Sequence, residues 1–323
     1  MHMDAAECTK PDLEDMTPVA KVEGLTPESI ARSLAPARAD SESERASRWR
    51  EDVGGGGVVV HGVLSRTECE ALRDELARGR ETFWKPGSEH STAMRFRNAT
   101  TCEVTCEQAA SELSRRLLPF LREGEDYIDI DQISPKHEQG LDGSWRADGV
   151  NAKLLFGRYP PGGHFAPHTD GSTVHSFNRR SLYSLIFYLN DCESGGETVL
   201  FQPPDNTADT SHYLFDSANR YRWPSEWEIG RARPVEGSVL AFPQELPHEG
   251  TPVGEGCEKV IIRTDIMYRR DPPVCDDEAG RAAFSKLLEA QEAEANGDAS
   301  AAVSLYARAN KLSPELTELC GLA

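Results

Sequence analysis

The chain has 323 residues, enough for one large domain with appendages or for two modest domains. Asp and Glu number 54 against 35 Lys and Arg, and the net charge of −19 argues against binding to nucleic acid or to an anionic membrane. No stretch approaches the roughly 18 apolar residues of a membrane-spanning helix, and the N-terminus lacks a signal-peptide pattern. The expected location is therefore cytoplasmic.

The first elements can be predicted from local patterns. Residues 1–52 are rich in Ala, Ser, Glu, Asp and Pro and show little apolar periodicity, which predicts a disordered or loosely attached segment. The β-branched run at 58–64 predicts a strand. A helix is expected next, because Ser65 and Glu68 form a capping box, and a second helix is expected over about 106–122.

From 151 to 270 the pattern changes to short β-type runs separated by turn residues. These runs are "AKLLFGRYP", "LYSLIFYLND", "ETVLF", "GSVLAFP" and "KVIIRTDIMY". Several short strands at this spacing favour an all-β barrel or jelly roll, and the chain contains neither a GxGxxG motif nor a Walker loop. A long aromatic insertion at about 203–233 is either a lid over the substrate channel or an ordinary packed excursion.

Helix-forming sequence returns at 281–319. Gly297, Ala302, Tyr306 and Pro314 stand at helix-hairpin spacing and resemble a single tetratricopeptide repeat. One repeat cannot bury its own apolar face, so a terminal helical hairpin is favoured over a peptide-binding array. The expected fold class is α+β, mainly β: a jelly roll flanked by helices, with a C-terminal helical hairpin.

Eight cysteines are scattered through the chain without a CxxC pair. Cys102 and Cys106 are close enough to meet on a helix, but no His or second Cys pair completes a zinc site. Reduced thiols are the favoured interpretation, and a disulfide between these two cysteines is a minor alternative.

One group of residues carries metal chemistry. His168 and Asp170 occur in "RYPPGGHFAPHTDG", and in a strand residues i and i+2 point to the same side. His248, just after a predicted strand, adds a second imidazole. Two imidazoles and one carboxylate can hold one face of an octahedral Fe(II) ion and leave the other face open. The HxD pair alone is common by chance, but the surrounding strand and turn pattern favours the metal site.

Residues 152–268 resemble the prolyl 4-hydroxylase-type branch of the Fe(II)- and 2-oxoglutarate-dependent dioxygenases. The resemblance rests on "LLFGRYPPGGHFAPHTDGS", "YSLIFYLND", "SGGETVLF", "PVEGSVLAFPQELPHEGTPV" and "GCEKVIIRTDIMY", and the earlier "VVVHGVLSRTECEALRDEL" is similar to the opening of the family domain. It implies a double-stranded β-helix over 53–272, with His168, Asp170 and His248 as catalytic iron ligands. The helical hairpin of 281–319 follows as a separate segment.

The resemblance also implies a binding site for the co-substrate. The far carboxylate of 2-oxoglutarate needs a cation, because an unpaired buried carboxylate is costly. Lys259 and Arg263 share one strand face, and the family spacing favours Lys259, which leaves Arg263 to the pocket wall or the substrate side. Tyr188 matches a tyrosine that contacts the same carboxylate, and Tyr159 matches a position that lines the pocket.

The expected activity is hydroxylation of a C–H bond with release of succinate and CO2. By resemblance the co-substrates are 2-oxoglutarate and O2, ascorbate supports turnover, and the substrate is suggested to be prolyl. The substrate itself, whether a peptide, a protein or a small molecule, is not encoded in the metal motif. Two alternatives stay open: a non-catalytic jelly-roll interaction protein with a vestigial metal site, and a cupin-type metal enzyme that uses no keto acid.

Overall fold

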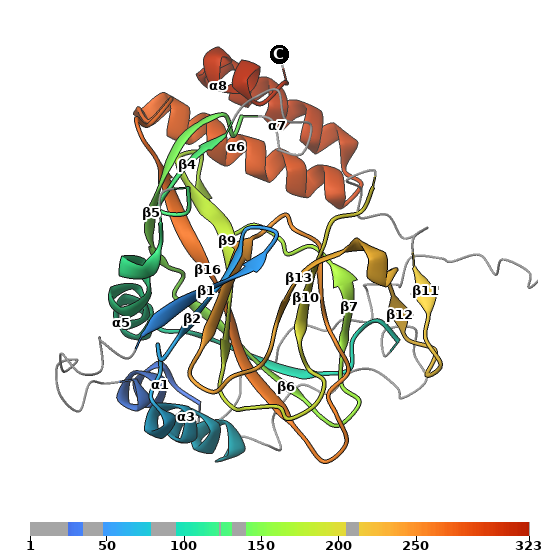
Figure 1. Cartoon of the computed structure of the whole chain (residues 1–323). Coiled ribbons are helices and arrows are strands. Elements are labelled where there is room, and N and C mark those ends of the chain that lie inside the picture. The colour runs from blue at the N-terminus through green and yellow to red at the C-terminus, as the bar shows by residue number, and fades with distance from the viewer. Residues whose placement is uncertain are drawn as a thin grey trace, which may run out of the picture. The chain divides into compact units, whose positions relative to one another are not determined.

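A computed structural model gives the structure of the protein (Figure 1). It describes residues 25–34, 48–78, 95–122, 124–130, 140–204 and 213–322. The chain divides into two compact units that alternate along the sequence. Unit 1 contains Met1–Phe120, Gly149–Gly171 and Leu182–Ile266, and unit 2 contains Leu121–Asp148, Ser172–Ser181 and Met267–Ala323. The domain boundaries expected from the sequence, 53–272 and 281–319, stay predictions.

Most of the strands in unit 1 belong to one large sheet. Its order is β1 (Trp49–Gly54), β2 (Gly57–His61), β14 (Val239–Pro243), β9 (Arg179–Tyr188), β16 (Lys259–Arg270), β6 (Lys153–Tyr159) and β3 (Thr100–Thr105). β9 begins, and β16 ends, with residues of unit 2. Four of the five apolar runs found in the sequence form strands of this sheet, and β9 and β16 are buried along most of their length. The fifth run, "ETVLF", forms β10 (Thr198–Phe201) of the second sheet.

A second, antiparallel sheet of unit 1 has four strands. Its order is β13 (Glu228–Ala232), β10 (Thr198–Phe201), β15 (His248–Gly250) and β7 (Phe165–His168). The core cluster combines side chains of both sheets, with Tyr188 and Leu240 from the large one and Leu200 and Ala232 from the small one. The two sheets therefore bury a shared core, and the predicted jelly roll is confirmed (Figure 1).

Helices flank the sheets of unit 1. They are α1 (Pro27–Ser33), α3 (Arg66–Arg78), α5 (Glu107–Leu117) and the 3-10 turn η3 (Leu118–Phe120). The capping box of α3 forms as predicted: the Ser65 N–H donates to the Glu68 carboxylate at 2.8 Å, and the Glu68 N–H donates to Ser65 Oγ at 3.3 Å. The Cys106 sulfur caps α5 by accepting from the Ala109 N–H at 3.4 Å, and the seven described cysteines are free thiols.

The N-terminal segment 1–52 differs in part from its prediction. Within it, α1 packs by its apolar residues, and Ile30 is fully buried. The Cys106 thiol donates to the Pro27 carbonyl at 3.3 Å, which ties the start of α1 to the start of α5. The helix is therefore ordered although its apolar periodicity is too short to notice in the sequence. Residues 1–24 and 35–47 lie outside the described residues.

The aromatic insertion contains small elements of its own. They are β11 (Leu214–Phe215), β12 (Tyr221–Arg222) and the 3-10 turn η5 (Ser225–Trp227), followed by β13, while residues 205–212 lie outside the described part. Trp223 packs edge-on against Phe201 of β10, with ring centroids 5.6 Å apart. Burial of this tryptophan holds the insertion against the small sheet.

Unit 2 contains the C-terminal helices and three short strand segments. The strands are β4 (Tyr127–Ile130), most of β5 (Gly143–Val150) and β8 (Val174–Ser176), and the helices are α6 (Glu278–Ala295), α7 (Ala299–Leu312) and α8 (Pro314–Leu319). Ala283, Leu287, Ala309 and Leu316 form the core of the helices, as the predicted hairpin requires. None of the described helices is long and apolar enough to cross a membrane.

Candidate functional site

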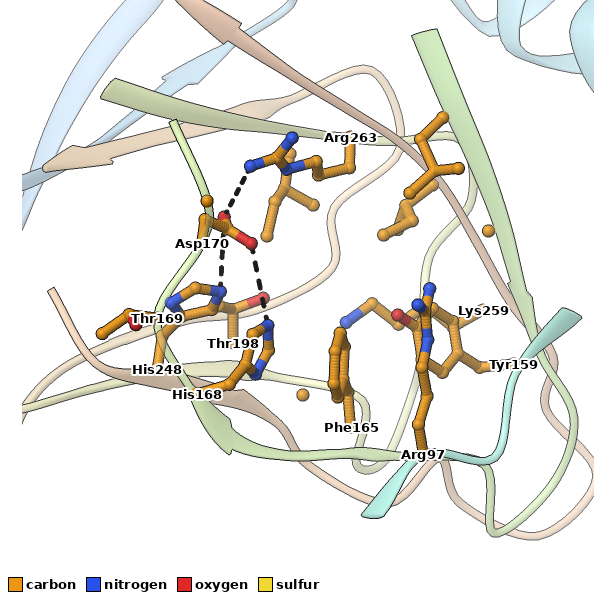
Figure 2. Close-up of a pocket in the computed structure, with 16 residues that line it drawn as sticks. Arg97, Tyr159, Phe165, His168, Thr169, Asp170, Thr198, His248, Lys259 and Arg263 are labelled. Carbon is orange, nitrogen blue, oxygen red and sulfur yellow. Dashed lines mark ion pairs between the residues drawn. The ribbon is translucent and has the colours of Figure 1, made fainter. Parts of the chain in front are cut away.

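Two histidines and one aspartate meet where the strands of the small sheet end. His168 is the last residue of β7 and lies directly opposite His248, the first residue of β15, in the antiparallel register. Asp170 follows two residues after His168. Its Oδ1 lies 3.8 Å from Nε2 of His168 and its Oδ2 lies 3.6 Å from Nε2 of His248 (Figure 2). One potential ligand atom from each residue thus lies within 4.8 Å of the others.

Backbone carbonyls fix the orientation of both imidazoles. Nδ1 of His168 lies 2.7 Å from the Ala166 carbonyl, and Nδ1 of His248 lies 3.0 Å from the Leu246 carbonyl. A carbonyl only accepts hydrogen bonds, so each Nδ1 carries the proton and each Nε2 presents a lone pair toward Asp170. Burial lowers the pKa of His168 to about 3 and also lowers the pKa of His248. Both rings are therefore neutral, as metal ligation requires.

The aspartate keeps its negative charge. Burial by itself raises the pKa of Asp170, but attraction to His248, Arg263 and His168 outweighs it and holds the pKa below its ordinary value. The Ser184 hydroxyl also donates to Oδ2 at 2.6 Å. Two neutral imidazoles and one carboxylate in this arrangement form the donor set of an Fe(II) site with open positions, so the residues present fit that ion.

A cavity of about 310 Å³ opens beside these three residues. This volume lies at the lower end of the range for small-molecule sites. The cavity is lined by Arg97, Leu155, Gly157, Tyr159, Phe165, His168, Thr169, Asp170, Gly171, Ile186, Thr198, His248, Gly250, Lys259, Ile261 and Arg263. Phe165 stacks on His168 with ring centroids 3.6 Å apart, so an apolar wall joins the metal ligands to the rest of the cavity.

Lys259 provides a cation to the cavity. It is paired with Tyr159 in the register of β16 and β6, and its side chain is 3% exposed. The ammonium lies 5.4 Å from the ring centroid of Tyr159 and 5.5 Å from that of Tyr188. Burial lowers its pKa to about 8. Among the described residues its ammonium forms no ion pair or hydrogen bond, which leaves it available to an anionic ligand.

The two predicted tyrosines differ in their access to the cavity. Tyr159 lines it, whereas Tyr188 is fully buried and is not among the lining residues. The Tyr188 hydroxyl lies 2.9 Å from Oγ1 of Thr198, which does line the cavity. Burial raises the pKa of Tyr188, so its hydroxyl stays protonated. The structure thus brings Thr198, which the sequence did not reveal, between Tyr188 and the ligand space.

Arg263 lines the same cavity but its charge is already compensated. One terminal nitrogen lies 3.3 Å from Asp170 (Figure 2), and the other lies 3.1 Å from Asp265. Asp265 is itself buried and accepts hydrogen bonds from Asn151 at 3.0 Å and Gln244 at 3.1 Å. Arg263 therefore supports the aspartate of the metal site, a role that strand alternation alone could not show.

Arg97 also lines the cavity and was not identified from the sequence. It forms an isolated antiparallel bridge with Phe165, and its guanidinium carbon lies 4.4 Å from the centroid of the Phe165 ring. Its sequence context, "RFRNAT", offers only an alternation of arginines as a signal. Without the bridge to β7, nothing connects this position to the histidines.

The comparisons agree with this geometry. Residues 154–264 match the family model described as the 2OG-Fe(II) oxygenase superfamily. Over this segment the chain is similar to the 2OG-Fe(II) oxygenase superfamily. The segment contains all three candidate metal ligands as well as Lys259 and Arg263, and its cofactor and co-substrate are Fe(II) and 2-oxoglutarate, as expected from the sequence. No curated protein sequence matches the chain.

Solved structures similar to the oxygenase domain include three with informative names. A prolyl-4-hydroxylase from Pseudomonas putida is 17% identical over 75% of this chain and 98% of its own, with a TM-score of 0.38. A viral collagen prolyl hydroxylase from Paramecium Bursaria Chlorella virus-1 is 18% identical over 66% and 96%, with a TM-score of 0.37. HygX from Streptomyces hygroscopicus, with nickel and 2-oxoglutarate bound, is 16% identical over 67% and 84%, with a TM-score of 0.40. Values this low carry no conclusion about the substrate.

Proposed function

We propose that the protein hydroxylates a C–H bond of its substrate, with His168, Asp170 and His248 as the iron ligands. The observation that carries this proposal is the approach of three ligand atoms within 4.8 Å, with both imidazoles held in the ligating tautomer. Bound Fe(II) would supply the activation of O2 that couples conversion of 2-oxoglutarate to succinate and CO2 with oxidation of the substrate. The protein contributes the fixed donors, the open cavity and the buried surroundings.

The second element of the proposal is the co-substrate site. Lys259 would pair with the far carboxylate of 2-oxoglutarate, because it is a buried cation without an anion among the described residues. Thr198 would donate its hydroxyl to the same carboxylate while Tyr188 positions that hydroxyl from behind. Tyr159 would form the adjacent wall.

Arg263 has a supporting role in this proposal. Its two ion pairs join Asp170 to the buried Asp265, so its loss would free the metal-binding carboxylate and strand a buried charge. This supports Lys259 over Arg263 as the co-substrate cation. A carboxylate arriving from 2-oxoglutarate would have to compete with two anions already at Arg263.

The proposed substrate and the proposed reductant rest on the family resemblance alone. The resemblance to the prolyl 4-hydroxylase-type branch suggests a prolyl substrate and a stimulation by ascorbate. The cytoplasmic location also stays a prediction. Proline peptides and ascorbate are therefore components to vary in the assay.

The test measures succinate formed from 2-oxoglutarate with added Fe(II), together with bound iron in the same samples. We expect activity in the wild type, and loss of both iron and succinate in His168→Ala and His248→Ala. His175→Ala is the matched control, because His175 is exposed and lies outside the cavity. Iron binding without succinate formation would favour the alternative of a vestigial metal site. Wild-type turnover in His248→Ala would show that the ligand set is wrong.

A further inference from the structure

Arg97 occupies a defined place at the metal site. Its guanidinium lies over the Phe165 ring at 4.4 Å, and His168 stacks on the same ring at 3.6 Å between centroids. His168, Phe165 and Arg97 follow one another across the cavity in Figure 2. A single aromatic ring therefore separates a permanently charged side chain from a candidate metal ligand.

The arginine lacks an anion among the described residues. Its Nε is buried and makes no hydrogen bond, and no ion pair joins Arg97 to a described carboxylate. Two other arginines of unit 1 contrast with it: Arg116 pairs with Glu68 at 2.7 Å, and Arg222 pairs with Glu249 at 2.5 Å. A half-buried guanidinium whose buried Nε donor is unmet is unfavourable unless a bound group satisfies that donor.

Fe(II) and 2-oxoglutarate together add no net charge to the cavity. The iron carries two positive charges and 2-oxoglutarate carries two negative charges, so together they add nothing. Arg263 and Lys259 are balanced in number by Asp170 and Asp265, and the imidazoles are neutral. Among these described residues, Arg97 is the cation whose charge no carboxylate in the count balances.

An aromatic wall lies next to this cation. Phe96 stands edge-on to Phe165 with ring centroids 5.5 Å apart, and it lies 6.3 Å from the ring of Tyr213 and 6.5 Å from that of Tyr221. The two tyrosines belong to the insertion, and the Tyr213 hydroxyl donates to the Pro167 carbonyl of β7. An apolar body of a ligand could thus pack beside the iron ligands while an anionic group reaches the arginine.

We infer that the substrate carries a carboxylate, which Arg97 binds through its planar pair of donors while the carbon skeleton packs against Phe165. The inference rests on the proposed function and narrows it to anionic substrates. Arginine suits this task because its fork matches the two oxygens of a carboxylate. The carboxylate can belong to a free small acid or to an acidic residue of a peptide, and both sources present the same chemistry.

The test is a calorimetric titration of paired probes into the anaerobic protein loaded with Fe(II) and 2-oxoglutarate. One set pairs N-acetylated amino acids with their primary amides, and the other pairs capped proline peptides containing Glu with the same peptides containing Gln. We expect at least one acid to bind about tenfold or more tightly than its neutral partner, since a charge-assisted hydrogen bond is lost in the amide. The set that shows the preference identifies the source of the carboxylate.

Substitutions connect that preference to the arginine. Arg97→Gln should reduce the preference to about twofold or less, and Arg97→Lys should keep part of it because the charge remains. Arg66→Gln is the matched control and should keep all of it, since Arg66 lies on the exposed face of α3 and is 81% exposed. No acid preference in the wild type, or a preference that survives Arg97→Gln, would overturn the inference. A tenfold loss of 2-oxoglutarate affinity in Arg97→Gln, with the acid preference intact, would overturn it by assigning Arg97 to the co-substrate.

Failure of this inference is distinguishable from failure of the proposed function. Succinate formation stimulated only by uncharged compounds would overturn the role of Arg97 and leave the oxygenase proposal standing. Acid-selective binding that depends on Arg97, without succinate formation under any condition, would support the role of Arg97 and overturn the oxygenase proposal.

Discussion

Replacement of Lys259 by methionine should weaken 2-oxoglutarate binding far more than any other single change on β16. Methionine keeps most of the length and apolar volume of the lysine stem, so the contacts with Tyr159 and Tyr188 remain. What disappears is the ammonium, which is 3% exposed and forms no ion pair with a described residue. The far carboxylate of 2-oxoglutarate would then enter the cavity without a cation.

The magnitude follows from burial. Removal of one partner of a buried charge pair costs about 2–5 kcal/mol, most of it from the charge left behind. At 1.4 kcal/mol per factor of ten, this corresponds to an increase in Kd of about 30-fold to 4,000-fold. Arg263→Met should act differently, because that guanidinium already contacts Asp170 and Asp265. Its main effect should be on iron affinity.

Anaerobic titration of 2-oxoglutarate into the Fe(II)-loaded variants measures this difference. Lys153→Met is the matched control, since Lys153 is 56% exposed and pairs with Glu103 outside the cavity. We expect wild-type affinity in the control and a large loss in Lys259→Met. If Lys259→Met binds 2-oxoglutarate within about threefold of wild type while Arg263→Met does not, the assignment of the two cations is reversed.

Three further predictions come from charged groups of unit 1. Burial lowers the pKa of Lys259 to about 8, and only the protonated ammonium can pair with a carboxylate. The affinity for 2-oxoglutarate should therefore fall by up to about tenfold per pH unit as the pH rises above this value. An affinity that does not change with pH in calorimetry would contradict the pairing. Arg222→Gln removes the two hydrogen bonds, of 2.9 and 2.5 Å, that join the insertion to the buried Glu249 beside His248. It should reduce substrate hydroxylation more than substrate-free decay of 2-oxoglutarate. Mass spectrometry measures both reactions, and equal losses would count against a lid. Arg116→Met should lower the free energy of unfolding by roughly 2–4 kcal/mol, since Arg116 is 4% exposed and pairs with two glutamates. Chemical denaturation measures this loss. Arg66→Met is the control and should leave the stability unchanged, because Arg66 is exposed.

The sequence was most informative where local geometry determines position. The i, i+2 spacing predicted that His168 and Asp170 meet, and they do, although β7 ends at His168 and Asp170 lies beyond the strand. The capping box predicted the start of α3. His248 was proposed from its place just after a predicted strand, but its register could not be predicted. The 77 residues between Asp170 and His248 contain no local signal that sets His248 opposite His168. Local rules thus predict single strands and helices, whereas the position of the candidate ligand His248 beside His168 depends on the fold.

Side-chain partners were the part that the sequence could not supply. Lys259 and Arg263 look equivalent by strand alternation, and the family spacing favoured Lys259 without showing what Arg263 contacts. The structure adds the ion pairs of Arg263 with Asp170 and Asp265. Arg97 was missed for a related reason. It lies more than sixty residues before Phe165, and its place in the cavity depends on one isolated bridge.

The overall charge and the charge of the cavity lead to different expectations. A net charge of −19 acts over long distances and disfavours nucleic acid and anionic membranes. The cavity reverses the sign locally, because Arg97, Lys259 and Arg263 all line it. At physiological ionic strength, exposed charges are screened beyond about 8 Å, whereas charges inside a buried cavity are screened much less. A small dicarboxylate and an acidic substrate can therefore be bound by a protein whose net charge is strongly negative, and the sign of the site has to be taken from the residues that line it.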